Sequence, residues 1–155
     1  MITAVLMAHG ILAVFLLGAL THQALAVWWR PARGGGSLFA SFRAVRAERY
    51  ANTVIILFAL TYGIGGGLIY PAYRYEVRPV LEQLRLNTVL GMFELKEHFV
   101  TVGLALLPVY WYFWKQPDAP ATVTARKMLT LILALVVWYA FVVGHLLNNT
   151  RGFGI

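Results

Sequence analysis

The chain has 155 residues, of which 60% are hydrophobic and only 12% are charged, against about 45–50% and about 25% in an ordinary soluble domain. A soluble fold of this size could not hide so much apolar surface, and a disordered chain needs the opposite composition. The absence of cysteine excludes a disulfide scaffold, a zinc ribbon and an iron–sulfur centre. The net charge of +7 does not indicate nucleic acid, because the basic residues lie in short segments between apolar runs. We therefore expect the lipid bilayer to be the solvent.

Four stretches are mostly apolar over about 18 residues or more, which is the length that a helix needs to cross a bilayer. We expect these spans near Ile2–Trp29, Ala51–Tyr70, Lys96–Trp114 and Met128–Leu147. The runs are continuous rather than alternating, so they favour helices over the strands of a membrane barrel. The sequence thus predicts an all-α integral membrane four-helix bundle, with residues 1–155 forming a single transmembrane domain.

The segments between the spans predict the orientation of the bundle. Segment 30–49 carries five arginines against Glu48, and segment 115–127 carries Lys115, Arg126 and Lys127 against Asp118. The segment between the second and third spans is nearly balanced in charge. Because cytoplasmic loops carry the excess of basic residues, we expect both termini on the outer, periplasmic side of a bacterial inner membrane.

Histidines within the spans are the candidate functional residues, because a polar group in lipid is costly and usually functional. With a rise of about 1.5 Å per residue, His9, His98 and His145 are expected about 9–12 Å to the outer side of the bilayer midplane. Three helices would then present imidazoles at one level. Imidazole suits haem iron, copper and zinc, so these three histidines are predicted to be metal ligands. Haem b is the favoured cofactor, and a copper site is the alternative.

Other residues near this level complete the predicted cofactor site. Gly65 and Gly66 in the second span would let a flat cofactor approach the backbone. Trp138 precedes His145 on the same helix face, and Arg74 would meet the haem propionates on the outer side. The alternative is purely structural, with the glycines serving tight helix packing and the histidines bonding between helices. Which two histidines would ligate iron stays open.

Two further features carry polar residues. His22 lies in the inner half, about 140° around the first helix from His9, and we interpret it as structural rather than proton-handling. Glu94 and Glu97 begin the third span, where acidic residues favour a helix N-terminus. With His98 they are similar to a carboxylate–histidine metal motif, but a di-iron site would need a second such motif, which the sequence lacks.

The layout resembles a loose group of small four-helix membrane proteins, the HemJ-type protoporphyrinogen oxidases and the related copper-resistance CopD-like domains. The resemblance rests on His9, on the basic segment Ser41–Tyr50 before the second span, and on Lys96 near the start of the third. In that oxidase family an early first-helix histidine and a third-helix lysine are linked to haem binding and activity, which implies these roles for His9 and Lys96. The architecture is also similar to cytochrome b-like, quinone-linked membrane subunits.

The sequence as a whole predicts a haem b-binding membrane protein in electron transfer, as a subunit of a respiratory or related redox complex. Other membrane or redox subunits are the expected partners, and a quinone is a candidate second cofactor. The alternatives are a HemJ-type oxidase, a structural or assembly subunit without a cofactor, and a copper-handling membrane protein. An electron-transfer subunit is favoured over a stand-alone enzyme.

Overall fold

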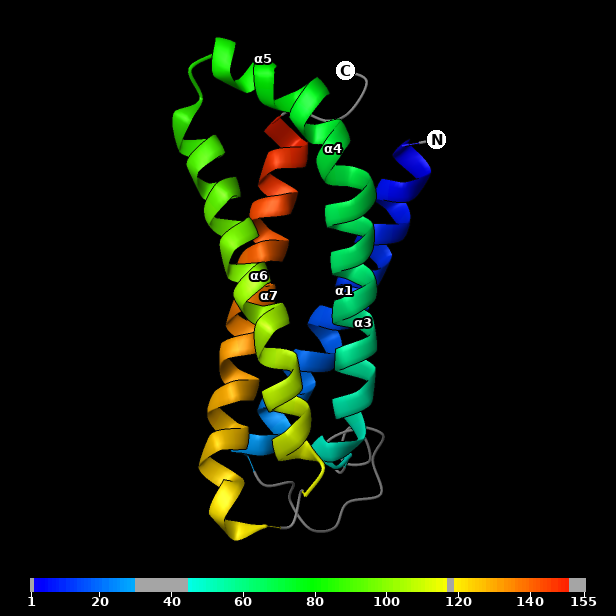
Figure 1. The fold of residues 1–155 in the computed structure, drawn as a ribbon, viewed down its shortest axis with the longest axis vertical. Coiled ribbons are helices and arrows are strands. Elements are labelled where there is room, and N and C mark those ends of the chain that lie inside the picture. Colours follow the sequence, from blue (N-terminus) through cyan, green and yellow to red (C-terminus); the bar gives the residue numbers. More distant parts are fainter. Residues whose placement is uncertain (1, 30–44, 117–118, 151–155) are drawn as a thin grey trace.

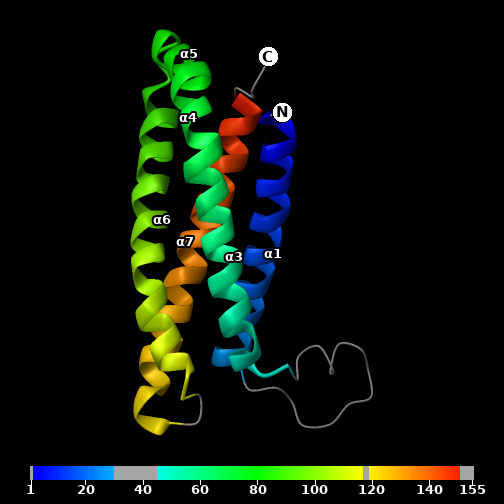
Figure 2. The ribbon, with the colours of Figure 1, turned by 45° about the vertical axis from the view of Figure 1, so that its right-hand side comes forward.

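The computed structural model describes residues 2–29, 45–116 and 119–150, and nearly all of them are helical. The bundle consists of α1 (Ile2–Trp28), a long bent helix from Ala47 to Gln83, α6 (Asn87–Trp114) and α7 (Val123–Thr150). These four run side by side (Figures 1 and 2), with α7 packed on both α1 and α6. The predicted all-α bundle of four helices is confirmed, and no strand occurs in the part of the chain that the structure describes.

The two chain ends lie at the same end of the bundle. Figure 1 shows α1 beginning and α7 ending at the end of the bundle where the helical segment α5 (Arg78–Gln83) lies, whereas α1 and α6 end, and α7 begins, at the opposite end. Parts of the charge argument fall outside the described residues, namely Arg30, Arg33, Arg43 and Asp118.

Three helical stretches are long and apolar enough to cross a membrane: Ile2–Trp28, Ala47–Gln83 and Pro120–Thr150. The last of these is α7 with the short 3-10 turn η4 (Pro120–Thr122) before it. Helix α6 is not among them, although a fourth span was predicted there. Its length is sufficient, but charged residues occupy its first half and leave too short an apolar stretch. We infer that α6 depends on its neighbours to cover this polar part.

The second span is longer than the sequence indicated, because the helix does not end at Tyr70. After the 3-10 turn η1 (Ala47–Tyr50), it continues without a break to Gln83. Its parts are α3 (Ala51–Ile64), η2 (Gly65–Ile69), α4 (Tyr70–Ala72), η3 (Tyr73–Val77) and α5 (Arg78–Gln83). Most of the segment that was expected to be a loop is therefore helical.

Two prolines lie within this helix without ending it. Pro71 and Pro79 each stand at the start of an α-helical piece, and each piece follows a π-helical segment, η2 or η3. Proline lacks an N–H and its ring clashes with the preceding turn of an α-helix. A locally wider turn relieves both problems, so the helix passes each proline instead of ending there.

The turn between α5 and α6 has an unusual residue at its centre. Arg85 has a φ of 54°, in the left-handed region that favours glycine. Its N–H donates to the Glu82 carbonyl at 3.0 Å, and the Leu86 N–H donates to the Leu81 carbonyl at 3.0 Å. These two bonds form the Schellman motif that ends a helix, so the strained position terminates α5 and lets α6 return along the bundle.

The interior has two separate buried clusters. The first core contains Leu20, Phe58, Tyr110 and Leu133, together with other residues of α1, α3, α6 and α7. The second core is built around Tyr73, Leu81, Phe93 and Val143, near the α5 end of the bundle. The helices therefore pack tightly at two levels, and the region between those levels is where a site can open.

A polar network lies inside the first core. Tyr110 Oη donates to Gln23 Oε1 at 2.6 Å, and Gln23 Nε2 donates to the Ala47 carbonyl at 3.1 Å. Gln23 and Tyr110 are both fully buried. Because an unpaired polar group in an apolar interior is costly, this pairing ties α1, η1 and α6 together.

Candidate functional site

A cavity of about 290 Å³ lies between the two cores, and all four long helices contribute to its walls. Phe58 and Val137 come to it from the first core, and Phe93 and Val77 come from the second. Phe141 adds a further aromatic side chain. The wall is therefore mostly apolar and aromatic, as in pockets that hold organic ligands.

Polar side chains from each helix also line this cavity. They are His9 of α1, Thr61 and Tyr62 of α3, Tyr70 of α4, Tyr73 of η3, Lys96 and Glu97 of α6, and His145 and Asn148 of α7. Such a collection is unusual in a bundle of this composition, because ionisable groups inside a membrane protein are rare and usually functional.

His9 is held in place by a close contact with Gly65. A Cβ atom built on Gly65 would lie only 2.9 Å from His9 Cε1, so a side chain at this position would displace the ring. Gly65 was expected to make room for a flat cofactor, but the space beside it is taken by the imidazole of His9.

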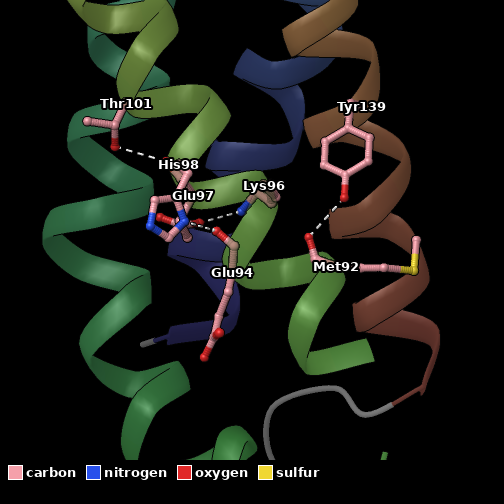
Figure 3. Close-up of polar contacts among 7 residues, drawn as sticks. All are labelled: Met92, Glu94, Lys96, Glu97, His98, Thr101 and Tyr139. Carbon is pink, nitrogen blue, oxygen red and sulfur yellow. Dashed lines mark hydrogen bonds and ion pairs between the residues drawn. The ribbon is translucent and has the colours of Figure 1, made fainter. Parts of the chain in front are cut away.

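Lys96 and Glu97 bring charge to the cavity. Lys96 Nζ donates to Glu97 Oε1 at 2.9 Å (Figure 3) and lies 4.4 Å from the centroid of the Phe93 ring. The side chain of Lys96 is only 17% exposed, and that of Glu97 is 32% exposed. Pairing with Glu97 and contact with the aromatic face both lower the cost of keeping the ammonium group in an apolar setting.

Three polar atoms of the cavity-lining residues are buried and unpaired. They are His9 Nδ1, Thr61 Oγ1 and Tyr73 Oη, none of which has a hydrogen-bond partner among the described residues. Most buried polar groups in proteins are hydrogen-bonded, so each exception calls for an explanation. Three such exceptions around one cavity indicate that a ligand or ordered water completes them.

The three predicted histidine ligands do not converge. His9 and His145 line the same cavity, although His145 is itself an exposed residue. His98 is also exposed and does not line the cavity. Instead, His98 Nδ1 bonds the Glu94 carbonyl oxygen of its own helix at 2.7 Å (Figure 3). Within the described ranges no group of three histidine, aspartate or glutamate side chains is placed to hold a metal ion. The described residues therefore do not bring the three histidines together, and the choice of the two that would ligate iron stays a prediction.

Two other predicted cofactor-binding residues lie away from the cavity, and one lies within it. Trp138 is 45% exposed and its Nε1 donates to Thr21 Oγ1 at 3.0 Å. Arg74 is exposed and does not line the cavity. Gly66 does line it, and a Cβ added there would meet no atom within 4 Å, so the backbone stays accessible at Gly66.

His22 belongs to the first core rather than to the cavity. Its ring lies 5.1 Å from that of Tyr50, measured between centroids, and its neighbour Gln23 forms the buried network described above. This setting agrees with the interpretation of His22 as a structural residue.

Sequence reasoning missed Thr61. Thr61 stands four residues before Gly65, so the i, i+4 spacing of one helix face could have pointed to it. Tyr73 lies in the segment that was expected to be a loop, and nothing in the sequence placed it next to the third span. No family model, curated protein or solved structure matches this chain, so its function must be argued from its own residues.

Proposed function

We propose that this chain is an integral membrane protein that binds haem b in the cavity between the two cores and takes part in electron transfer. The observation that carries the proposal is the gathering of polar residues, His9 and His145 among them, around one apolar cavity. Imidazole from facing helices is a common way for proteins to hold haem iron.

The donor set of the cavity suits haem. Haem iron needs at most two protein ligands, and His9 and His145 come to the cavity from different helices, α1 and α7. His9 Nδ1 is buried without a partner among the described residues, so this nitrogen is free to take a bound group. The cavity volume of about 290 Å³ is close to the lower end of about 300–1,000 Å³ for ligand pockets. Haem would therefore extend beyond the cavity.

The residues of this chain would bind, orient and shield such a cofactor. His9 and His145 would hold the iron, and Gly65 would fix the His9 ring by leaving room for it. The aromatic wall would exclude water, which tunes the potential of the bound group. Haem itself would supply the one-electron chemistry.

The proposal also includes the expected orientation of the bundle in a bacterial inner membrane. Lys115, Arg126 and Lys127 lie around the connection between α6 and α7, at the end of the bundle opposite to the chain ends. The positive-inside rule then directs the cavity toward the outer half of a bacterial inner membrane. Other redox subunits, and a quinone, are the proposed partners.

The test is purification in mild detergent, followed by iron analysis and a reduced-minus-oxidised spectrum. The proposal predicts bound iron and a b-type α-band at roughly 560 nm. A pure, folded, colourless protein without iron would contradict it. Copper in place of iron would favour the copper-handling alternative instead.

A second candidate function is that of a HemJ-type protoporphyrinogen oxidase. The observation that favours it is that His9 and Lys96, the two residues on which the resemblance to that family rests, line the same cavity. The test is growth rescue of a bacterium that lacks protoporphyrinogen oxidase. Rescue by the native chain, and loss of rescue in Lys96→Met at equal protein level, would support the oxidase; failure of the native chain to rescue would oppose it.

A further inference from the structure

An open apolar groove lies on the surface of the bundle between α3 and α6. Its lining residues are Asn52, Ile55, Ile56, Leu104, Leu107, Pro108 and Trp111. The two helices contact each other toward the end of the bundle opposite to the chain ends (Figure 1). None of the seven residues lines the cavity between the two cores, so the groove is separate from the proposed haem site.

The groove changes from polar to apolar along its length. Asn52 stands in the first turn of α3 and Trp111 in the last turn of α6, so both lie at the same end of the bundle. Ile56 and Leu104 lie further toward its middle, and the helical rise from Trp111 to Leu104 is about 10 Å. Tryptophan is enriched where a membrane protein meets the headgroups. The groove therefore has the polarity of a phospholipid, with a polar end at the surface and an apolar end within the bilayer.

Lys115 stands at the polar end of the groove. Its Nζ lies 3.9 Å from the centroid of the Trp111 ring, and Trp111 lines the groove. Lys115 is exposed and forms no ion pair among the described residues. An ammonium group carries three hydrogen-bond donors, so Lys115 can donate to phosphate oxygens while it rests on the indole ring.

The charges around this end favour an acidic headgroup. Arg49 is exposed and stands three residues before Asn52, in the turn that leads into α3. Glu48 is the nearest carboxylate along the described chain, and it is paired with Arg46 at 2.8 Å. No described carboxylate lines the groove. Basic sites between membrane helices of this kind bind acidic lipid headgroups.

We propose that the groove binds an acidic phospholipid, with one acyl chain along Ile56 and Leu104 and the headgroup phosphate at Lys115. Leu107 belongs both to the groove and to the first core, so the acyl chain covers the outer side of that core. The lipid site is independent of the haem site and stands whether or not the cavity holds haem.

The experiment is native mass spectrometry of the full chain in detergent, which counts both lipids and chains in each particle. The protein is titrated with dioleoyl phosphatidylglycerol and with dioleoyl phosphatidylcholine, which has the same acyl chains but no net charge. Lys115→Gln removes the cation of the groove. Lys127→Gln is the matched control, because Lys127 Nζ lies 5.2 Å from the Trp28 ring centroid and neither of these residues lines the groove.

We expect the native chain to bind phosphatidylglycerol about fivefold more tightly than phosphatidylcholine, as one cation near the membrane surface implies. Lys115→Gln is expected to lose most of this preference and Lys127→Gln to keep it. Equal binding of the two lipids would overturn the proposal. An equal loss of preference in the two variants would also overturn it, because surface charge in general would then explain the binding.

A second pair of variants tests the place of the acyl chain. Ile56→Trp fills the groove from a position that is already 58% exposed, so it is expected to weaken the binding of both lipids without disturbing the fold. Leu60→Trp is the control, because Leu60 is 49% exposed one turn further along α3 and does not line the groove. Unchanged lipid binding in Ile56→Trp would overturn the proposal. Particles of two chains that separate in Ile56→Trp would assign the groove to a second copy of this chain and overturn it as well.

Discussion

The polar network of the first core is hydrogen-bonded, whereas several buried polar groups around the cavity are unpaired. In the first core, Gln23 is bonded on one side to Tyr110 and on the other to the Ala47 carbonyl. Around the cavity, His9 Nδ1, Thr61 Oγ1 and Tyr73 Oη are buried without partners in the described residues. A paired network stabilises the fold by itself, whereas unpaired groups that share a cavity are satisfied only when something occupies it.

Two other unpaired polar atoms lie away from the cavity and provide a comparison. Thr130 Oγ1 and Trp114 Nε1 also lack partners among the described residues, but neither residue lines the cavity. Single unpaired atoms of this kind occur in most proteins. The signal for a site is therefore the gathering of several such atoms around one space, and the predictions below separate the two regions on that basis.

The largest effect is expected from Gly65→Ala. The added Cβ would lie 2.9 Å from His9 Cε1, so the ring must leave its place. We expect affinity for haem to fall about a hundredfold or more, since the variant misplaces an axial ligand. Gly66→Ala is the matched control, because its Cβ meets no atom within 4 Å. Equal haem affinities of the two variants, measured by titration, would contradict the placement of His9.

Gly103→Ala makes the corresponding change in the first core. Its Cβ would lie 2.8 Å from Phe58 Cζ and 3.3 Å from Val136 Cγ1. Overpacking of this kind is expected to lower the free energy of unfolding by about 2–3 kcal/mol, as measured by SDS titration in mixed micelles. Because Phe58 also lines the cavity but is not a proposed ligand, haem affinity of the folded protein should fall much less than in Gly65→Ala. A loss of haem affinity without a loss of stability would contradict the assignment of Gly103 to a region that serves the fold rather than the cavity.

Two buried tyrosines allow a direct comparison of paired and unpaired hydroxyls. Tyr110→Phe leaves Gln23 Oε1 without its donor, so it is expected to cost about 1–2 kcal/mol in the free energy of unfolding. Tyr73→Phe breaks no hydrogen bond among the described residues, so the ligand-free protein should be equally stable or slightly more stable. The same SDS titration of both variants checks the pair. A larger cost for Tyr73→Phe would mean that its hydroxyl serves the fold.

The smallest effect concerns the turn between α5 and α6. Arg85→Gly removes the strain of a φ of 54°, but it also makes the unfolded chain more flexible. We expect a net gain of about 0.5 kcal/mol in the free energy of unfolding, because the left-handed position dominates. Arg85→Ala is the control, since alanine keeps the strain and should give no gain. Neither variant should alter haem affinity.

The sequence predicted the helical class for a clear physical reason. Five of its candidate site residues line the cavity, namely His9, Gly65, Gly66, Lys96 and His145, and Lys96 among them was named only from the family resemblance. Apolar runs of sufficient length predict helices in a bilayer, and the early histidine His9 and Lys96 do meet at one cavity. His98 failed because depth along a helix says nothing about direction around it. Lys96 and His98 are two residues apart, which is about 200° around a helix, so only one of them can face the cavity.

The remaining misses come from the second span. The apolar run ends near Tyr70, so the residues after it were expected to form a loop, whereas π-helical turns carry the helix past Pro71 and Pro79. Tyr73 lies between them and reaches Phe93 of α6. That contact depends on how far the helix extends and on which face it presents, and local sequence patterns do not contain this information.

The central claim is that the cavity, and not the exposed face of α6, holds haem iron. Its most direct test is the reduced-minus-oxidised spectrum of three matched single variants, His9→Ala, His145→Ala and His98→Ala, each purified at equal protein concentration. The account predicts that the b-type band is lost or strongly altered in His9→Ala and His145→Ala and is unchanged in His98→Ala. A band that survives in His9→Ala, or one that disappears only in His98→Ala, would contradict it.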